Sequence, residues 1–293
     1  MTIADEFEAH RPRLFGLAYR LLGSAAEAED TVQDAYLRFD AAERTGIEHP
    51  KAWLAKVVTN LALTRLTSAR VRRERYVGTW LPEPVITADG TLGPFESAEQ
   101  RDAVSMAMLV LLERLTPAER AVYVLREAFA YGHREIAGVL DLTEANSRQL
   151  YRRAVQRVGE SGSRFDARPE HREELVASFI TAAREGDLTT LEKILAADAT
   201  WSADGGGRAN ASPRPIEGRE KVVRLLAGIG ERWTTGLEFT PAEINGTSGL
   251  TAWAGDELVG VLSFEVRGGL IGEVRIVVNP EKLGFVRGQL ATG

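Results

Sequence analysis

The stretch HREIAGVLDLTEANSRQLYRRAVQR, residues 133–157, predicts two short helices joined by a tight turn. We expect the first helix over residues 134–140 and the second over residues 144–158. Residues 141–143 are expected to form the turn, because the Thr143 hydroxyl can accept a hydrogen bond from the first turn of the next helix. The first helix offers small or apolar side chains to its neighbour, namely Ile136, Ala137, Val139 and Leu140.

Two faces of the second expected helix differ in chemistry. Its apolar face has a spacing of i, i+4 and i+8 and is expected to pack on the first helix. Its rotated polar face holds arginine and glutamine, which read guanine and adenine edges in the major groove of DNA. The pattern therefore favours a helix-turn-helix that reads duplex DNA; the alternative is a surface helix pair with solvated arginines. The apolar face is Leu150, Ala154 and Val158, and the polar face is Ala145, Arg148, Gln149 and Arg152, with Arg153 and Arg157 beside it within reach of phosphates.

Composition and charge limit the chemistry open to this chain. Its 293 residues suffice for two or three domains. Cysteine is absent and the four histidines are dispersed, so the sequence predicts no metal site and no cofactor. The N-terminus lacks the apolar core of a signal peptide and no apolar run approaches the roughly 20 residues of a membrane span, so we expect a cytoplasmic protein without a membrane partner. A net charge of −6 is unusual for a free DNA binder, which suggests that another molecule helps to hold the chain on DNA.

Three longer stretches carry a family resemblance. AEDTVQDAYLRF at residues 28–39 and PKAWLAKVVTNLALTRLTSARVRRE at residues 50–74 resemble the sigma-2 domain of extracytoplasmic-function RNA polymerase sigma factors. LERLTPAERAVYVLREAFAYGHREIAGVLDLTEANSRQLYRRA at residues 112–154 resembles the sigma-4 domain of the same family. The resemblance implies two all-α domains, a sigma-2 helical bundle over residues 1–76 and a sigma-4 helix-turn-helix domain over residues 101–160. Capping patterns predict helix starts at Ser24 with Glu27 and at Thr116 with Glu119.

The resemblance also implies partners for the sigma-2 residues. One acidic helix side is expected to dock on the clamp helices of the β′ subunit of core RNA polymerase, with a solvated helix face as the alternative. The following helix is expected to open the −10 promoter element and capture an unstacked base, for which an aromatic ring and a short amide are suited. A core position for Trp53, and solvation of the arginines, are the alternatives. The expected polymerase contacts are Asp30, Gln33 and Asp34, and the expected −10 contacts are Trp53, Asn60, Arg65, Arg70, Arg72 and Arg73.

In the sigma-4 domain, the resemblance makes the helix-turn-helix the reader of the −35 promoter element. The expected contacts are those of its polar face and flank, namely Ala145, Arg148, Gln149, Arg152 and Arg153.

Residues 77–100 contain no lysine or arginine and are expected to form an extended linker. The WLPEP segment within it is too apolar for a plain spacer, and its prolines pre-set an extended backbone that loses little entropy on docking. It resembles a motif of the SigJ-like subgroup of these sigma factors, whose members carry a C-terminal SnoaL-like domain; the alternative is that Trp80 only anchors the linker on its own protein. WLPEP consists of Trp80, Leu81, Pro82, Glu83 and Pro84.

The C-terminal third, residues 170–293, differs in kind and follows a second expected linker at residues 161–169. Its pattern of helices and then strands predicts an α+β cone enclosing an apolar pocket. It resembles the SnoaL-like members of the NTF2-like superfamily, and two further motifs match the subgroup. Helices are expected over 170–184, 188–197 and 220–228, and strands over 199–203, 237–244, 250–254, 257–266 and 270–278. The motifs are DGGGR (Asp204, Gly205, Gly206, Gly207 and Arg208) and NPEKL (Asn279, Pro280, Glu281, Lys282 and Leu283).

Catalysis is not expected in this third of the chain. Asp204 is the one carboxylate suspected at the pocket mouth, and acid–base chemistry needs a partner group that the sequence does not offer. The glycine run is interpreted as a loop that needs positive φ or the close approach of another segment. We therefore expect a pocket kept without catalysis, with room for an unidentified small ligand.

The sequence leads to one functional hypothesis and two alternatives. The chain is expected to bind core RNA polymerase through its β′ clamp and β subunits and to direct it to promoter DNA. WLPEP, DGGGR and NPEKL are expected to join the SnoaL-like domain to the sigma domains and to regulate their spacing. The alternatives are a ligand-sensing helix-turn-helix regulator that acts without polymerase, and a SnoaL-type enzyme fused to a DNA anchor.

Overall fold

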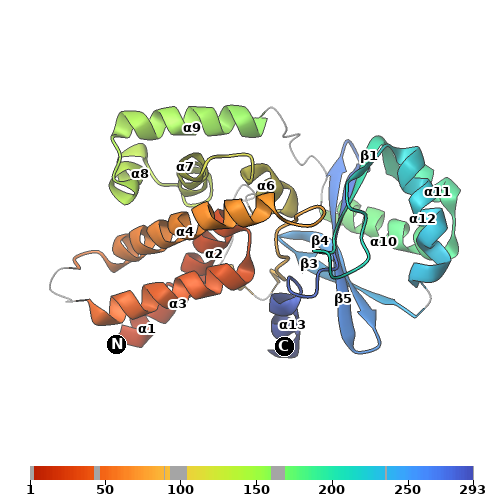
Figure 1. The fold of residues 1–293 in the computed structure, drawn as a ribbon, viewed down its shortest axis with the longest axis horizontal. Coiled ribbons are helices and arrows are strands. Elements are labelled where there is room, and N and C mark those ends of the chain that lie inside the picture. The colour runs from red at the N-terminus through yellow and green to blue at the C-terminus, as the bar shows by residue number, and fades with distance from the viewer. Residues whose placement is uncertain are drawn as a thin grey trace. The chain divides into compact units, whose positions relative to one another are not determined.

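The computed structural model describes residues 3–42, 47–88, 90–92, 104–159, 169–234 and 236–292. Its internal contacts divide the chain into two compact units (Figure 1). The helical unit consists of Met1–Arg75 and Asp89–Gly162, and the α+β unit consists of Tyr76–Ala88 and Ser163–Gly293. Within the described part of the chain, no helix combines the length and apolarity needed to cross a membrane.

The first half of the helical unit is a helical bundle. Gly23 ends one helix with a φ of 68°, and Ser24 starts the next because its hydroxyl accepts a hydrogen bond from the Glu27 amide at 3.1 Å. The predicted cap at Ser24 is thereby confirmed. The helices are α1 (Ile3–Glu8), α2 (Arg11–Leu22), α3 (Ala25–Ala41) and α4 (Pro50–Glu74). Their apolar sides meet in a core that includes Phe7, Phe15, Leu17, Leu21, Val32, Phe39 and Leu54.

The second half of the helical unit contains the predicted helix-turn-helix, which the structure confirms. Thr116 and Glu119 form the predicted capping box at its entry. The turn contains Asp141, with a φ of 53°, and Thr143, whose hydroxyl accepts a hydrogen bond from the Asn146 amide at 3.2 Å. The helices are α6 (Met106–Leu112), α7 (Pro117–Glu127), α8 (His133–Leu140) and α9 (Glu144–Gly159). On α9, Ala154 and Val158 are buried and Leu150 is half-buried.

Buried arginines join the two halves of the helical unit. Arg120 of α7 is 1% exposed, and its Nε donates a hydrogen bond to the Arg20 carbonyl of α2 at 3.1 Å. Glu113, which follows α6, accepts hydrogen bonds from Arg120 and from Arg73 at the end of α4. The sigma-2-like and sigma-4-like helices therefore share one compact unit that is held partly by buried charge.

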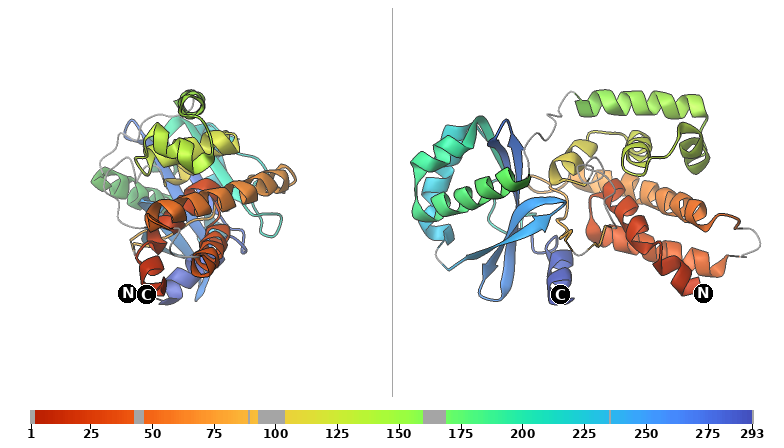
Figure 2. Two further views of the ribbon diagram at one scale, coloured as in Figure 1. Left: turned by 90° about the vertical axis from the view of Figure 1, so that its left-hand side faces the viewer. Right: turned by 180° about the vertical axis from the view of Figure 1, so that it is seen from behind.

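The described residues of the α+β unit form one six-stranded sheet with the order β2-β1-β6-β5-β4-β3. β1 and β6 are parallel, and the other neighbouring strands are antiparallel. Figures 1 and 2 show α10, α11 and α12 on one face of this sheet, which confirms the predicted α+β arrangement. The strands are β1 (Leu195–Asp204), β2 (Ile216–Glu217), β3 (Glu238–Ile244), β4 (Thr247–Ala254), β5 (Glu257–Arg267) and β6 (Leu270–Val277), and the helices are α10 (Pro169–Glu185), α11 (Leu188–Ile194), α12 (Arg219–Thr234) and α13 (Gly284–Thr292).

Several details of this unit differ from the sequence-based expectation. The helix expected over residues 188–197 ends at Ile194, and β1 begins directly at Leu195, well before the expected strand. Leu195 is fully buried and pairs with Ile271 of β6, so burial in the sheet prevails over the helix propensity of the alanines that follow. The short strand β2 and the helix α13 were not expected either.

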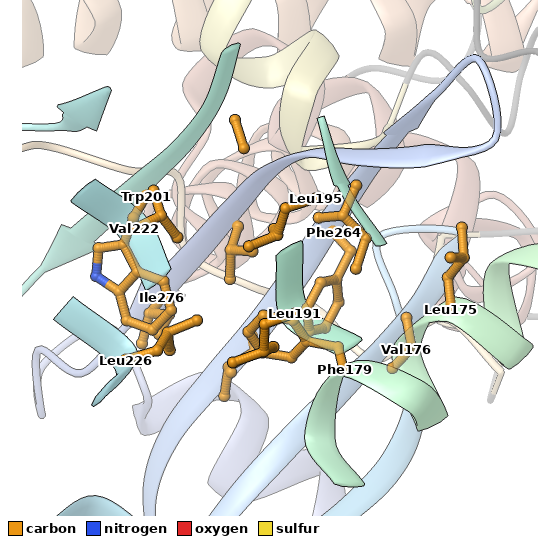
Figure 3. Packing of buried hydrophobic residues seen from close by; sticks show 14 of the residues in the cluster. Leu175, Val176, Phe179, Leu191, Leu195, Trp201, Val222, Leu226, Phe264 and Ile276 are labelled. Atoms are coloured by element: carbon orange, nitrogen blue, oxygen red, sulfur yellow. The ribbon is translucent and has the colours of Figure 1, made fainter. Parts of the chain in front are cut away.

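Apolar side chains fill the space between the sheet and its helices (Figure 3). Phe179 of α10 and Phe264 of β5 meet edge to face with ring centroids 5.3 Å apart, and Trp201 of β1 is buried beside β6. These side chains form the core of the α+β unit, and the expected apolar pocket stays a prediction. The cluster also includes Leu175, Val176, Leu191, Leu195, Val222, Leu226 and Ile276.

Replacing Phe179 tests this core. Phe179→Ala removes a buried ring and should lower the free energy of unfolding of the α+β unit by about 3–5 kcal/mol. Urea unfolding of the full chain, followed by tryptophan fluorescence, measures the change. Leu188→Ala is the control, because that side chain is 38% exposed and should change the same quantity by less than about 1 kcal/mol. Similar losses in both variants would show that Phe179 does not belong to the core.

Candidate functional site

The polar face of α9 is open to solvent. Ala145, Arg148, Gln149, Arg152 and Arg153, the predicted −35 contacts, are all exposed. Arg148 forms an ion pair with Glu144, one turn earlier on the same helix. This face can therefore meet a DNA groove without any rearrangement of α9.

Aromatic and polar contacts fix α9 against α7. The Tyr151 hydroxyl donates a hydrogen bond to Glu127 Oε1 at 2.5 Å, and the Tyr151 ring stacks on Tyr123 with ring centroids 6.5 Å apart. Burial, and then the hydrogen bond to Glu127, raises the pKa of Tyr151 to about 12, so this hydroxyl stays protonated near neutral pH. The exposed face of α9 thus has a fixed orientation on its supporting helix.

The predicted polymerase contacts and one predicted −10 contact lie together. Asp30 and Gln33 on α3 are exposed and Asp34 is half-buried. The Arg65 guanidinium of α4 pairs with Asp34 Oδ2 at 2.7 Å and lies 3.7 Å from Asp30 Oδ2. Arg65, which is expected to contact DNA, thus pairs in this structure with two carboxylates that are expected to contact polymerase.

The other predicted −10 residues of α4 have different surroundings. Trp53 is half-buried with its ring centroid 5.8 Å from that of Phe39, which is the core packing named as the alternative. Asn60 is exposed. Arg73 points inward to Glu113 and to the Leu22 carbonyl, and burial lowers its pKa. The side chains of Arg70 and Arg72 lie outside the described residues.

The three motifs WLPEP, DGGGR and NPEKL meet inside the α+β unit at Asp204, which is fully buried. Its Oδ1 accepts a hydrogen bond from the Tyr76 hydroxyl at 2.6 Å, and its Oδ2 accepts one from the Leu81 amide at 2.8 Å. Lys282 Nζ pairs with the same Oδ2 at 2.7 Å. We call these four residues the Asp204 junction.

Lys282 contacts both the Asp204 carboxylate and the aromatic rings of Tyr76 and Trp80. Its Nζ lies 4.3 Å from the Trp80 ring centroid and 4.7 Å from that of Tyr76, and it also donates to the Leu81 carbonyl. Cation–π contacts of this kind strengthen when water is excluded. The charge of Lys282 is therefore balanced by a carboxylate, a carbonyl and two aromatic faces.

The glycine run of DGGGR permits a close approach, as the sequence indicated. Gly206 has a φ of 58°, and a Cβ placed on it would lie 2.3 Å from Asn279 Nδ2. Asn279 uses that amide to donate a hydrogen bond to the Tyr76 hydroxyl at 2.8 Å. A side chain at Gly206 would displace Asn279 from Tyr76. On the surface beside this contact, Arg208 pairs with Glu281 at 2.6 Å.

The chain after WLPEP continues along the β3–β4 hairpin. Val85 and Asn245 exchange hydrogen bonds, from the Val85 amide to Asn245 Oδ1 at 3.2 Å and from the Asn245 amide to the Val85 carbonyl at 2.9 Å. Ile86 forms an isolated β-bridge with Ile244, and the Gln289 side chain of α13 both accepts from and donates to the Ile86 backbone. The predicted linker is thus part of the α+β unit up to residue 88.

Sequence reasoning missed Tyr76, Asn245 and Gln289 as parts of this site. Asn245 and Gly246 form the turn of the β3–β4 hairpin, with the two positive φ angles, 52° and 71°, that a tight Asn-Gly hairpin needs. A tyrosine next to an apolar proline-containing motif is the one signal that could have drawn attention to Tyr76. Among the described residues, no cluster of side chains is suited to hold a metal ion.

The titration of Tyr76 gives a test of the junction. Burial, and then the hydrogen bond to Asp204, raises the pKa of Tyr76 above its ordinary value near 10. The unfolded chain therefore loses this proton at lower pH than the folded chain, so the stabilisation is complete below about pH 10 and declines as pH rises above it. Urea unfolding of the α+β unit between pH 8 and pH 11 should show this decline in the wild type and a smaller one in Tyr76→Phe.

Tyr36→Phe, which removes a tyrosine of the helical unit, is the matched control and should keep the wild-type decline. An identical alkaline decline in wild type and Tyr76→Phe would contradict the junction as described.

Two sequence models of known families match the helical unit: Sigma-70 region 2 over residues 7–72, and Sigma-70, region 4 over residues 105–158. The ECF RNA polymerase sigma factor SigJ of Mycobacterium tuberculosis is 38% identical over 289 residues, which are 95% of this chain and 92% of SigJ. The probable ECF RNA polymerase sigma factor SigI of the same species is 30% identical, over 99% of this chain and 98% of SigI.

A solved structure extends this likeness to the fold. The crystal structure of Mycobacterium tuberculosis SigJ matches with a TM-score of 0.77 and 34% identity, over 96% of this chain and 98% of that one. The similarity therefore spans the α+β unit as well as the sigma regions, and the resemblance to extracytoplasmic-function sigma factors noted from the sequence is confirmed. This chain belongs to the extracytoplasmic-function family of RNA polymerase sigma factors.

Proposed function

We propose that this chain directs core RNA polymerase to promoters, with the helix-turn-helix on the −35 element and the sigma-2 helices on the −10 element. The observation that carries the proposal is the exposed polar face of α9 in a chain of this family. Arginine and glutamine on an exposed helix suit guanine and adenine edges in the major groove. The function requires the chain to work in the cytoplasm, where chromosome and polymerase meet.

Polymerase supplies what an acidic chain lacks. A net charge of −6 opposes binding to phosphates, although arginines are concentrated on α9 and at the end of α4. Asp30 and Gln33 are exposed on α3, where an acidic side suits a basic surface of the polymerase clamp. We infer that the two DNA-reading domains bind a promoter only as part of a holoenzyme.

We infer that the α+β unit carries out no catalysis. Asp204, the carboxylate suspected from the sequence, is fully buried, and both its oxygens accept hydrogen bonds from neighbours. A general acid or base must come within hydrogen-bonding reach of a substrate, and this geometry does not offer Asp204 to one. A small ligand in this unit stays a prediction.

We propose that the α+β unit regulates the sigma domains by holding the chain that connects them. The two matched sigma regions end at residue 72 and resume at residue 105, so the segment 76–88 lies in their connection. Each extended residue spans at most about 3.3–3.6 Å, so fixing this segment shortens the distance that the connection can bridge. Two domains that read promoter elements a fixed distance apart depend on that reach.

Loss of the polar face of α9 should abolish promoter selectivity. Arg148→Ala and Arg152→Ala should each weaken specific promoter binding by about 1–3 kcal/mol, which is roughly 5- to 150-fold. Run-off transcription from genomic fragments, with core polymerase and each variant, measures the effect. Arg224→Ala, at an exposed position of α12, is the control and should transcribe like the wild type. Specific DNA binding without co-purification of core polymerase would favour the polymerase-independent regulator instead.

Release of the connecting segment should change transcription. Three altered chains are compared with the full chain in holoenzymes: chains cut after residues 165 and 278, and Asp204→Asn. Each change removes part of the Asp204 junction, so the run-off yield of each should differ from that of the full chain. Tyr76→Phe is the milder variant, since it removes the two hydrogen bonds of the Tyr76 hydroxyl and leaves the buried ion pair. Asp256→Asn, in the exposed β4–β5 turn, is the charge-matched control. Equal yield from all these chains would rule out regulation by the α+β unit.

A further inference from the structure

Lys56 lies on α4 between two residues expected to contact the −10 strand. Trp53, Lys56 and Asn60 are spaced at i, i+3 and i+7, which places them on one face of the helix. A single DNA strand carries a phosphate at every nucleotide, and a lysine on the same face is well placed to neutralise one.

The helix-turn-helix occupies Lys56 in this structure. Lys56 Nζ donates a hydrogen bond to the Gly138 carbonyl at 3.0 Å and pairs with Asp141 Oδ1 at 2.6 Å. Both oxygens belong to the C-terminal end of α8, where aligned peptide dipoles add partial negative charge. A carboxylate oxygen and a carbonyl oxygen at this end offer a lysine much the same chemistry as two oxygens of a phosphodiester.

Asp141 is a poor residue for the position that it holds. It caps α8 in the left-handed region, with φ 53° and ψ 46°, which glycine, asparagine and aspartate adopt more readily than other residues. Its carboxylate also stands at the negative end of a helix, which disfavours a second negative charge. A charge that conflicts with the helix dipole is expected at a functional or strained position, and Lys56, 85 positions away in sequence, balances it here.

We propose that Lys56 contacts the DNA backbone beside the −10 element, and that Asp141 with the end of α8 occupies it as a phosphate substitute until the sigma domains separate. The inference rests on the proposed function, since it needs a chain that binds promoter DNA. Lys56 cannot bind DNA and Asp141 at the same time. DNA binding therefore favours the state in which the sigma domains are apart, and the state in which Lys56 contacts Asp141 disfavours DNA binding. The contact thereby couples separation of the domains to strand binding.

The absence of cysteine makes the first half of the test direct. Spin labels on cysteines introduced by Thr67→Cys in α4 and Val155→Cys in α9, both at exposed positions, report the distance between the sigma domains in the full chain. Asp141→Asn keeps a residue that tolerates the left-handed cap and removes the charge, so it should raise the population of long distances about two- to fivefold. Asp256→Asn should leave the distribution unchanged.

The second half uses the holoenzyme on a promoter fragment that it transcribes, at several salt concentrations. Lys56→Met should weaken binding and reduce the salt slope by about 0.7, the value for one phosphate contact on a single strand, whereas Lys56→Arg should keep the slope. Lys221→Met, in the α+β unit, should bind like the wild type. Asp141→Asn should have no effect here, because the domains are already apart in the holoenzyme.

Each result decides between stated alternatives. A full wild-type salt slope in a transcribing Lys56→Met holoenzyme would overturn the DNA contact. An unchanged distance distribution in Asp141→Asn would overturn the proposal that Asp141 takes the place of a DNA phosphate on Lys56. A wild-type holoenzyme that transcribes no genomic fragment would overturn the proposed function, and the inference with it.

Discussion

Burial of the Asp204 carboxylate is the constraint on which the structure of the α+β unit and its hold on residues 76–88 depend. A charge removed from water needs an opposite charge and hydrogen-bond donors, because an unpaired buried charge is strongly destabilising. Lys282 meets this need together with the Tyr76 hydroxyl and the Leu81 amide of segment 76–88, and both partners are far from Asp204 in sequence. If one stretch leaves, the others keep buried groups without partners, so the contact forms or breaks as a whole.

The helical unit uses the same physical device at a different place. Arg73 and Arg120 both donate hydrogen bonds to Glu113, and Arg120 is almost fully buried. Buried ion pairs add little net stability compared with apolar packing of the same volume, but removing one partner is costly. Charged groups also rehydrate when such a contact opens, whereas a large exposed apolar face promotes aggregation. Both units therefore join distant segments partly through buried charges.

Much of the fold could be predicted because its signals are local. The caps at Ser24 and Thr116 each depend on residues within a few positions. The environment of Asp204 could not be predicted in this way, since its partner Tyr76 lies 128 positions earlier and no periodicity links the two. Arg73 shows the same limit, because a basic run suggests DNA contacts while its actual partner, Glu113, lies 40 positions away. The early end of α11 at Ile194 is likewise decided by the sheet and not by the helix itself.

The α+β unit combines a segment from before the sigma-4 helices with residues from after them, and this order matters during synthesis on the ribosome. Segment 76–88 is made before the sigma-4 helices, but Lys282 and Asn279, which bind it, are made long after those helices. Because ribosomes add about 5–20 residues per second and domains fold as they emerge, the sigma regions are complete several seconds before the segment can be captured. Every newly made molecule thus passes through an interval in which its two sigma regions are joined by an untethered connection.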